Sequence, residues 1–461
     1  MQPNASILPA ESVGDMRTRM SIALLATVVT LVCILLVNPT SMAHFAWYFC
    51  VWNAFVLLLH REWSGQFAFA FLVNSAFVGI FVLVQSTVFP DSYGTTSPLA
   101  VSWTDDSFFF TSVADTVPAE LFTREDYWLY EPVFAQLIRL ITPLPIGHPL
   151  DVLFFQSGTA ALLATFSAKL MLQLSRDRQL ANVVFVFAVI CPFLLMNGGA
   201  ILLRDTLTAA LFVYSLCCIN ERRFVSTAVV IALQMAIRPG TGAIFMFAYP
   251  IIYFAELRNF IGRWPITSAI MTMLFVFGIV IVFPLAIEYV GGMYDLGGGV
   301  VSLLGREVYT DLAADSSVNA LFLMIQEMPF VVRLVLNAAY IFLYPFLSIR
   351  TVLDAQQFDL RSFLLNIVAP IYSLWLNAWF FAGALRGKPV IDRQRAITVA
   401  LVVILMLVGT YSLQTRHKTI IYPLYYLLIA VGFAKATQNS RRVGYALAGL
   451  LFFVQVASQF R

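Results

Sequence analysis

Charged residues are scarce in this sequence, and their scarcity decides the class of protein. Aspartate, glutamate, lysine and arginine make up 11% of the 461 residues, whereas hydrophobic residues make up 60%. Soluble domains usually carry about 25% charged residues. The mean hydropathy of +0.83 points in the same direction. The composition therefore excludes an ordinary soluble domain and predicts an all-α, polytopic membrane protein.

Cysteine and histidine are also rare. The five cysteines fall within apolar stretches, and the four histidines are scattered along the chain without the spacing of a metal site. We therefore expect neither a disulfide framework nor a structural metal. A net charge of only +3, without a basic arm, also argues against a nucleic-acid partner.

Long apolar runs are what the sequence has in abundance. A membrane-spanning helix needs about 20 apolar residues. On that measure we expect about thirteen spans, near 20–37, 43–59, 66–89, 151–174, 180–197, 201–219, 224–237, 241–255, 265–287, 362–385, 396–415, 419–434 and 443–460. Ser41-Met42-Ala43, which follows the first run, loosely resembles a signal-peptidase site. Because the run is longer than the apolar core of a signal peptide, we expect an uncleaved anchor helix.

Charge in the connecting segments predicts the orientation. Cytoplasmic loops of membrane proteins are enriched in lysine and arginine. Residues 90–150 contain eight acidic residues against two arginines, and residues 288–328 contain six against one, so both loops are expected outside, the first of them partly helical. The basic loops expected inside carry Arg17/Arg19, Arg61, Arg176/Arg178, Arg222/Arg223, Arg258/Arg263, Arg386/Lys388/Arg393/Arg395 and Arg441/Arg442.

This orientation predicts two hairpins, which turn at Asn197-Gly198-Gly199 and at Arg238-Pro239-Gly240. Residues 329–347 are expected to be re-entrant or interfacial, because a full crossing there would place the basic loop at 386–395 outside. The predicted organisation is an N-terminal helix pair at 1–65, a core at 66–434 that includes external loops 90–150 and 288–361, and a C-terminal helix at 435–461.

Five basic side chains at helix ends are candidates for binding an anion. A charge on a spanning helix is unfavourable by about 2.5–3.5 kcal/mol on insertion scales, so such residues are usually paired or functional. On this topology they all come to the outer face, as candidate phosphate ligands: Arg204, Arg238, Arg416, His417 and Lys418. A local ion pair between Arg204 and Asp205, and snorkelling of Arg238 to water, remain alternatives.

The external loop contains the candidate base. Asp105 and Asp106 follow Trp103-Thr104 and precede three phenylalanines, which suit the level of the lipid headgroups. Helix capping is the alternative role for these two aspartates. A second patch, a possible sugar-binding surface, holds Tyr127, Trp128, Tyr130 and Glu131.

Taken together, the layout resembles the GT-C superfamily of membrane glycosyltransferases, and within it the bacterial surface-polysaccharide polymerases that use polyprenol-linked sugars. The resemblance rests on four short motifs within residues 66–434, namely Trp103-Thr104-Asp105-Asp106, Leu203-Arg204-Asp205-Thr206, Ile237-Arg238-Pro239 and Arg416-His417-Lys418 before Tyr422-Pro423-Leu424. One departure is that the acidic loop follows the third predicted span, whereas the family usually has it after the first.

The resemblance implies an inverting transfer of a sugar or glycan from polyprenyl phosphate or diphosphate to an acceptor hydroxyl. Asp105 or Asp106 would be the general base, and the basic residues would bind the departing phosphate. The lipid-linked sugar would be the donor, with a divalent metal left open. The expected location is the bacterial inner membrane, with the active face periplasmic or extracellular and with other polysaccharide-assembly proteins as partners. The alternatives are a transporter or flippase of lipid-linked oligosaccharide, a glycan ligase and a non-catalytic scaffold.

Overall fold

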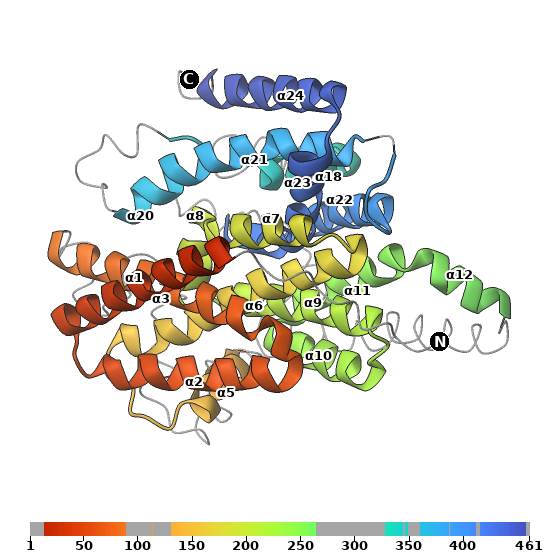
Figure 1. Cartoon of the computed structure of the whole chain (residues 1–461). Helices are drawn as coiled ribbons and strands as arrows, with labels where there is room; N and C mark the ends of the chain where they lie inside the picture. The colour runs from red at the N-terminus through yellow and green to blue at the C-terminus, as the bar shows by residue number, and fades with distance from the viewer. Residues whose placement is uncertain are drawn as a thin grey trace, which may run out of the picture.

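The computed structural model describes residues 13–88, 113, 131–263, 328–343, 346–348, 360–386, 388–411 and 415–457, and within these ranges it contains helices and no strand (Figure 1). The all-α expectation is confirmed for this part of the chain. The helices are α1 (Val13–Val37), α2 (Ser41–His60), η1 (Arg61–Trp63), α3 (Ser64–Val88), α5 (Glu131–Ile141), α6 (Pro149–Ser175), α7 (Arg178–Val189), α8 (Pro192–Leu195), η3 (Met196–Ala200), α9 (Arg204–Asn220), α10 (Phe224–Ile237), α11 (Pro239–Ile252), α12 (Phe254–Arg263), α18 (Phe330–Leu343), α20 (Leu360–Phe363), η5 (Leu364–Val368), α21 (Ala369–Ala384), α22 (Gln394–Tyr411), η6 (Thr415–Ile420), α23 (Tyr422–Lys435) and α24 (Gln438–Ala457).

Within the described residues, four helical segments are long and apolar enough to cross a membrane, or five if the bent pair 178–189 and 192–200 is one span. The expected count of thirteen is therefore not confirmed. Several predicted runs form shorter helices, such as α10 and α11 with 14 residues each. The predicted run at 265–287 lies outside the described residues.

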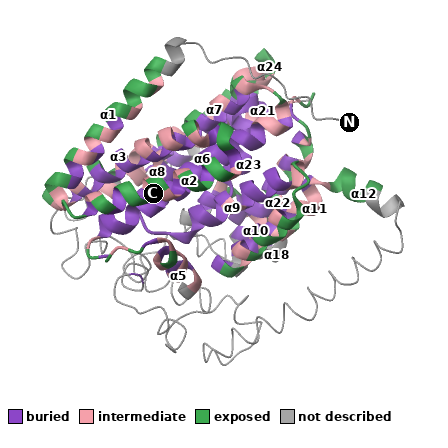
Figure 2. Ribbon diagram, turned by 60° about the horizontal axis from the view of Figure 1, so that its bottom comes forward, coloured by how far each residue is buried: buried purple, intermediate pink, exposed green. Residues whose placement is uncertain are grey.

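The centre of the bundle is α6, whose apolar window is entirely buried. It packs against α2, α3, α7 and α9. Figure 2 shows α6, α9 and α23 as buried helices, whereas much of α1, α12 and α24 faces outward. The exposed side chains of α1 are mainly apolar, which is expected of a helix that faces lipid.

Helices α6 and α9 run in the same direction. Near their starts, the Gln156 side chain donates to the carbonyl of Leu203 over 2.6 Å. Near their ends, the Gln173 side chain donates to Glu221 over 3.0 Å. The segment between them must therefore return along the bundle, as the first predicted hairpin requires. It does so through α7, a 54° bend and the π-helical turn η3.

This return segment corrects the predicted position of the turn. Asn197, Gly198 and Gly199 belong to the short π-helix η3. The chain reverses direction after η3, in residues 201–203. The backbone becomes extended at Ile201 and Leu203, and α9 begins at Arg204. Gly198 packs closely on α9, since a Cβ there would lie 3.0 Å from the Thr206 hydroxyl oxygen.

The second predicted hairpin is confirmed. Helix α10 ends at Ile237 and α11 begins at Pro239, a residue suited to the first helical position. The Ser215 and Tyr249 hydroxyls lie 2.5 Å apart, and the rings of Phe212 and Phe245 stack at 3.9 Å. These contacts place α11 parallel to α9, so Arg238 comes to the end of the bundle where α9 begins.

Three of the segments predicted to share one face meet at one end of the bundle. Arg393 donates to Asn220 over 3.0 Å, the Asp392 amide donates to the carbonyl of Leu174, and Lys435 lies 2.9 Å from Asp177. We call this the basic end, defined by Arg176, Arg223, Arg393 and Lys435. The opposite end is called the Arg204 end, defined by Arg204 and Arg238.

Helix α18 occupies the segment that was expected to be re-entrant or interfacial. Its 14 residues are fewer than the roughly 20 needed for a crossing. It packs against α22, and its Phe342 carbonyl accepts a hydrogen bond from Lys418. Helices α10 and α11 have the same length, so the length of α18 does not distinguish a re-entrant segment from a crossing, and the expectation stays a prediction.

Tight packing of α21 against α23 provides a test of the fold. A Cβ on Gly432 would clash with the carbonyl oxygen of Trp379, whereas a Cβ on Gly449 meets no atom within 4 Å. We expect Gly432→Ala to lower the thermal unfolding midpoint in detergent, by an amount corresponding to about 1–3 kcal/mol or more. Gly449→Ala is the control and should leave the midpoint unchanged or raise it slightly. Equal midpoints for the two variants would contradict the close packing.

Candidate functional site

The candidate site begins where α9 starts inside the bundle. Every residue from Met196 to Ala210 is buried, including Arg204 and Asp205 in the first turn of α9. The first turn of a helix has amide groups without intrahelical partners and a partial positive charge. Arg204 adds a full positive charge to this buried region. An anion would be favoured here on electrostatic grounds.

The charge of Asp205 is balanced by an arginine from the second hairpin. Asp205 Oδ1 lies 2.5 Å from Arg238 Nη1, and both side chains are buried. Neither Asp205 oxygen has a hydrogen bond of favourable geometry, so the contact is an ion pair and the carboxylate retains capacity to accept hydrogen bonds. Snorkelling of Arg238 to water is therefore wrong.

Lys418 lies on the turn that packs against this region. Helix η6 contacts both α9 and η3. Lys418 is 1% exposed and donates to the Phe342 carbonyl over 2.9 Å. Burial lowers the pKa of its ammonium group to about 7. A nearby anion would favour the charged form of Lys418.

Two neutral amides with unused hydrogen-bonding atoms also face this buried region, and the sequence analysis missed them. The Gln156 side-chain oxygen and the Asn197 side-chain nitrogen have no hydrogen-bond partner. Gln156 is held by its bond to Leu203, and the Asn197 carbonyl accepts weakly from Thr206 over 3.4 Å. Buried polar atoms without partners are rare and often mark a ligand or water position. The only sign of these two residues in the sequence is that each is a single amide within an apolar run.

The structure brings together part of the predicted site. Arg204, Asp205, Arg238 and η6 share the Arg204 end. Arg416 and His417 belong to η6, and Glu131 is the first residue of α5. The structure describes the backbone of these three residues but not their side chains. Five predicted residues lie outside the described part of the chain altogether: Asp105, Asp106, Tyr127, Trp128 and Tyr130.

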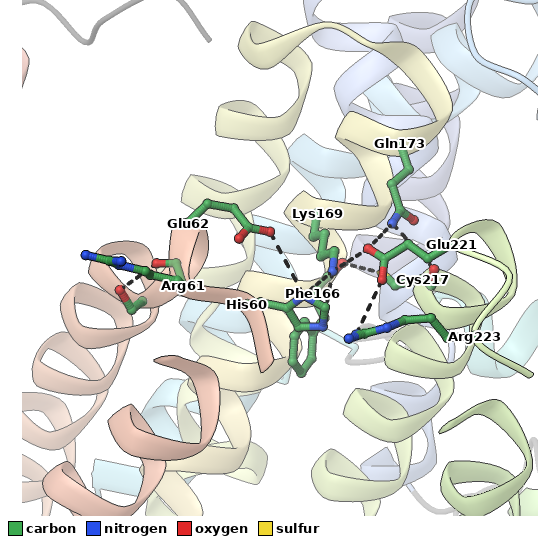
Figure 3. Close-up of polar contacts among 10 residues, drawn as sticks. His60, Arg61, Glu62, Phe166, Lys169, Gln173, Cys217, Glu221 and Arg223 are labelled. Atoms are coloured by element: carbon green, nitrogen blue, oxygen red, sulfur yellow. Dashed lines mark hydrogen bonds and ion pairs between the residues drawn. The ribbon is translucent and has the colours of Figure 1, made fainter. Parts of the chain in front are cut away.

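A second buried charged centre lies at the basic end (Figure 3). Lys169 on α6 lies 2.6 Å from Glu221 Oε1 and 2.6 Å from His60 Nδ1. Lys169 is a further buried cation, at the opposite end of the bundle from Arg204, and the sequence analysis did not single it out. Lys169 was overlooked because a single charge hardly changes the hydropathy of a 27-residue helix.

Metal ligands do not cluster in this part of the chain. The described residues contain no group of three or more histidine, cysteine, aspartate or glutamate side chains that could hold an ion. The five cysteines are free thiols, and four of them are buried. The Arg204 end places buried cations beside a helix start, an arrangement that would favour an anion.

Comparison with known proteins gives no further assignment: no family model matches the sequence, and neither a curated protein nor a solved structure shows significant similarity to it.

The pairing of Asp205 with Arg238 can be measured. Removing one partner of a buried ion pair typically costs about 3–5 kcal/mol, because the other charge is left unbalanced. We expect Asp205→Asn and Arg238→Gln each to lower the unfolding midpoint, and the double variant to recover most of the loss. Unfolding in detergent of the four proteins gives the coupling energy. Strictly additive losses would show that the two side chains do not interact.

Proposed function

We propose that this chain is a membrane glycosyltransferase or polysaccharide polymerase that uses a sugar carried on polyprenyl phosphate or diphosphate. The observation that supports the proposal most directly is the buried cationic region at the Arg204 end. Arg204 and Arg238 come from different hairpins, and Lys418 comes from a third segment that packs on α9. Guanidinium groups match phosphate oxygens in two-point fashion, and exclusion of water strengthens the interaction.

In this proposal the cations stabilise the charge on the departing phosphate. The acceptor hydroxyl gives its proton to Asp105 or Asp106, and its oxygen attacks the anomeric carbon. The bond from that carbon to the phosphate oxygen breaks, and the configuration inverts. Arg416 and His417 are additional phosphate-binding candidates, and Tyr127, Trp128, Tyr130 and Glu131 are candidates for the sugar surface. The proposed location is a bacterial inner membrane with about thirteen spans and an external active face.

The pairing of Arg238 with Asp205 has a consequence for binding. In the structure the Arg238 guanidinium already pairs with the Asp205 carboxylate. An incoming phosphate must therefore share the guanidinium with Asp205 or displace Asp205 from it. A diphosphate diester carries two negative charges against the one on Asp205, and a polyprenyl phosphate gains a second charge when the sugar leaves it. The unused hydrogen-bonding capacity of Asp205 suits the hydroxyls of a sugar next to that phosphate. The ligand proposed here therefore combines a phosphate with a polyhydroxylated group.

A transfer assay in liposomes that contain lipid-linked sugar and an acceptor tests the proposal. Loss of a general base should lower the rate about 10²–10⁴-fold, and loss of a charge-stabilising group about 10²–10³-fold. We expect Asp105→Asn or Asp106→Asn, together with Arg238→Gln, to show such losses. Arg442→Ala changes an exposed arginine at the start of α24 and should retain the activity. Full turnover by all three site variants would contradict the proposal.

The Asp205→Asn/Arg238→Gln double variant separates folding from chemistry in the same assay. It should remain folded, because neither charge is left alone, yet it should still lose transfer. Wild-type turnover by this folded variant would remove Arg238 from the mechanism.

A transporter or flippase of lipid-linked oligosaccharide is the second candidate. One observation favours it: buried cations are ion-paired at both ends of α9, Arg238 with Asp205 and Lys169 with Glu221, as expected of a pathway that is closed at each end. Movement of lipid-linked sugar across the bilayer without an acceptor would support this candidate. Consumption of the donor only when an acceptor is present would support the transferase.

A further inference from the structure

The second charged centre joins three helices that are distant in the sequence. His60 is the last residue of α2, Lys169 lies on α6, and Glu221 follows the end of α9 (Figure 3). Lys169 Nζ lies 2.6 Å from His60 Nδ1, 3.1 Å from His60 Nε2 and 2.6 Å from Glu221 Oε1. One ammonium group therefore connects the ends of α2 and α9 to α6.

The cluster is closed off from water on the side of Lys169 and His60. Each of these residues is 4% exposed. The ring of His60 packs edge-on against Phe166 at 5.9 Å and against Tyr214 at 5.6 Å. In such surroundings the interaction of two charges is much stronger than in water.

The short distances to the Lys169 ammonium group favour a neutral His60. Buried Lys169 pairs with the carboxylate of Glu221, whose side chain is 30% exposed, and a neutral imidazole nitrogen can accept a hydrogen bond from the ammonium group. If His60 took up a proton, two cations would lie 2.6 Å apart beside a single carboxylate. The three side chains would change from a net charge of zero to one of +1.

The remaining groups around His60 do not offset that charge. Glu62 on η1 lies 4.0 Å away, but its side chain is 53% exposed, so its effect is screened by water. Arg223 lies 3.6 Å from Glu221 and adds a further positive charge. Arg61, which follows His60 on η1, is exposed and adds positive charge, and the uncharged side chains described at this point come from α6 and α9: Gln173, Tyr214, Cys217 and Cys218.

We propose that His60 is a proton-binding site at the basic end, and that proton uptake there releases Lys169 from Glu221 and loosens the junction of α2, α6 and α9. The effect extends beyond these helices. Glu221 accepts a hydrogen bond from Gln173, and Gln173 in turn accepts one from Asn220. Asn220 accepts hydrogen bonds from Arg393 and from Tyr253, which lies on the α11–α12 connection. Acidification on that side therefore weakens a continuous polar network. This inference does not depend on the proposed sugar transfer.

The sign of the pH effect follows from linkage. An imidazole in an unfolded chain takes up a proton near pH 6.5. The folded cluster resists that proton, so the unfolded state binds more protons as the pH falls below about 6.5. Stability is then lost on the acid side. Above that pH the junction is intact.

Thermal unfolding of the full-length chain in detergent tests this, at about pH 7.5 and pH 5.5, which bracket the ordinary imidazole titration. We expect the midpoint of the wild-type protein to fall by several degrees on acidification. In His60→Gln the residue can still accept a hydrogen bond but cannot titrate, so most of that drop should disappear. His44→Gln is the control: His44 is also buried on α2, but it lies 3.2 Å from Asp151 near the opposite end of the helix, so this variant should keep the drop.

A second variant decides the matter even if His60→Gln does not fold. In Lys169→Met/Glu221→Gln, His60 is retained and the ammonium group that opposes its proton is removed. We expect this protein to show a much smaller drop than the wild type. The proposal would be overturned if the unfolding midpoint of either variant fell on acidification as much as that of the wild type. It would also be overturned if His60→Gln and His44→Gln reduced the fall of the midpoint equally.

Discussion

Helix α9 is held at both of its ends by an ion pair with a buried residue from another segment, and much of the bundle is arranged around these two contacts. Asp205 meets Arg238 at one end, and Glu221 meets Lys169 at the other. Because an unpaired charge is strongly disfavoured in such surroundings, each pair fixes the relative position of the helices that supply it. Together the two pairs fix α9 against α6 and against the α10–α11 hairpin.

The two ends have different chemical properties. At the Arg204 end, cations from three segments lie beside the start of a helix, and nearby amides and a carboxylate have unused hydrogen-bonding atoms. At the basic end, Lys169, His60 and Glu221 satisfy one another. The first arrangement suits a ligand that carries an anion and hydroxyls, and the second suits control of the helix junction. This difference is why the sugar-phosphate site is proposed at the Arg204 end.

Local patterns in the sequence predicted much of this arrangement. The run at 224–237 matches α10 residue for residue, and Arg238-Pro239 marks the turn because proline cannot continue the preceding helix. The excess of arginine and lysine in short loops identified the segments that meet at the basic end. What the sequence could not supply were partners that depend on tertiary packing. Asp205 pairs with a residue from another hairpin, and Lys169 pairs with residues on α2 and after α9. Hydropathy also missed the bend near residue 190, because it sums composition and is insensitive to the backbone break.

The most direct test of the central claim is the position at which a photoreactive polyprenyl phosphate attaches to the purified, reconstituted protein. A diazirine placed next to the phosphate should label the start of α9, the α10–α11 turn or η6, and an excess of unmodified polyprenyl phosphate should suppress the labelling. Labelling concentrated at the basic end around Lys169, or labelling that the unmodified lipid does not suppress, would contradict a phosphate site at the Arg204 end.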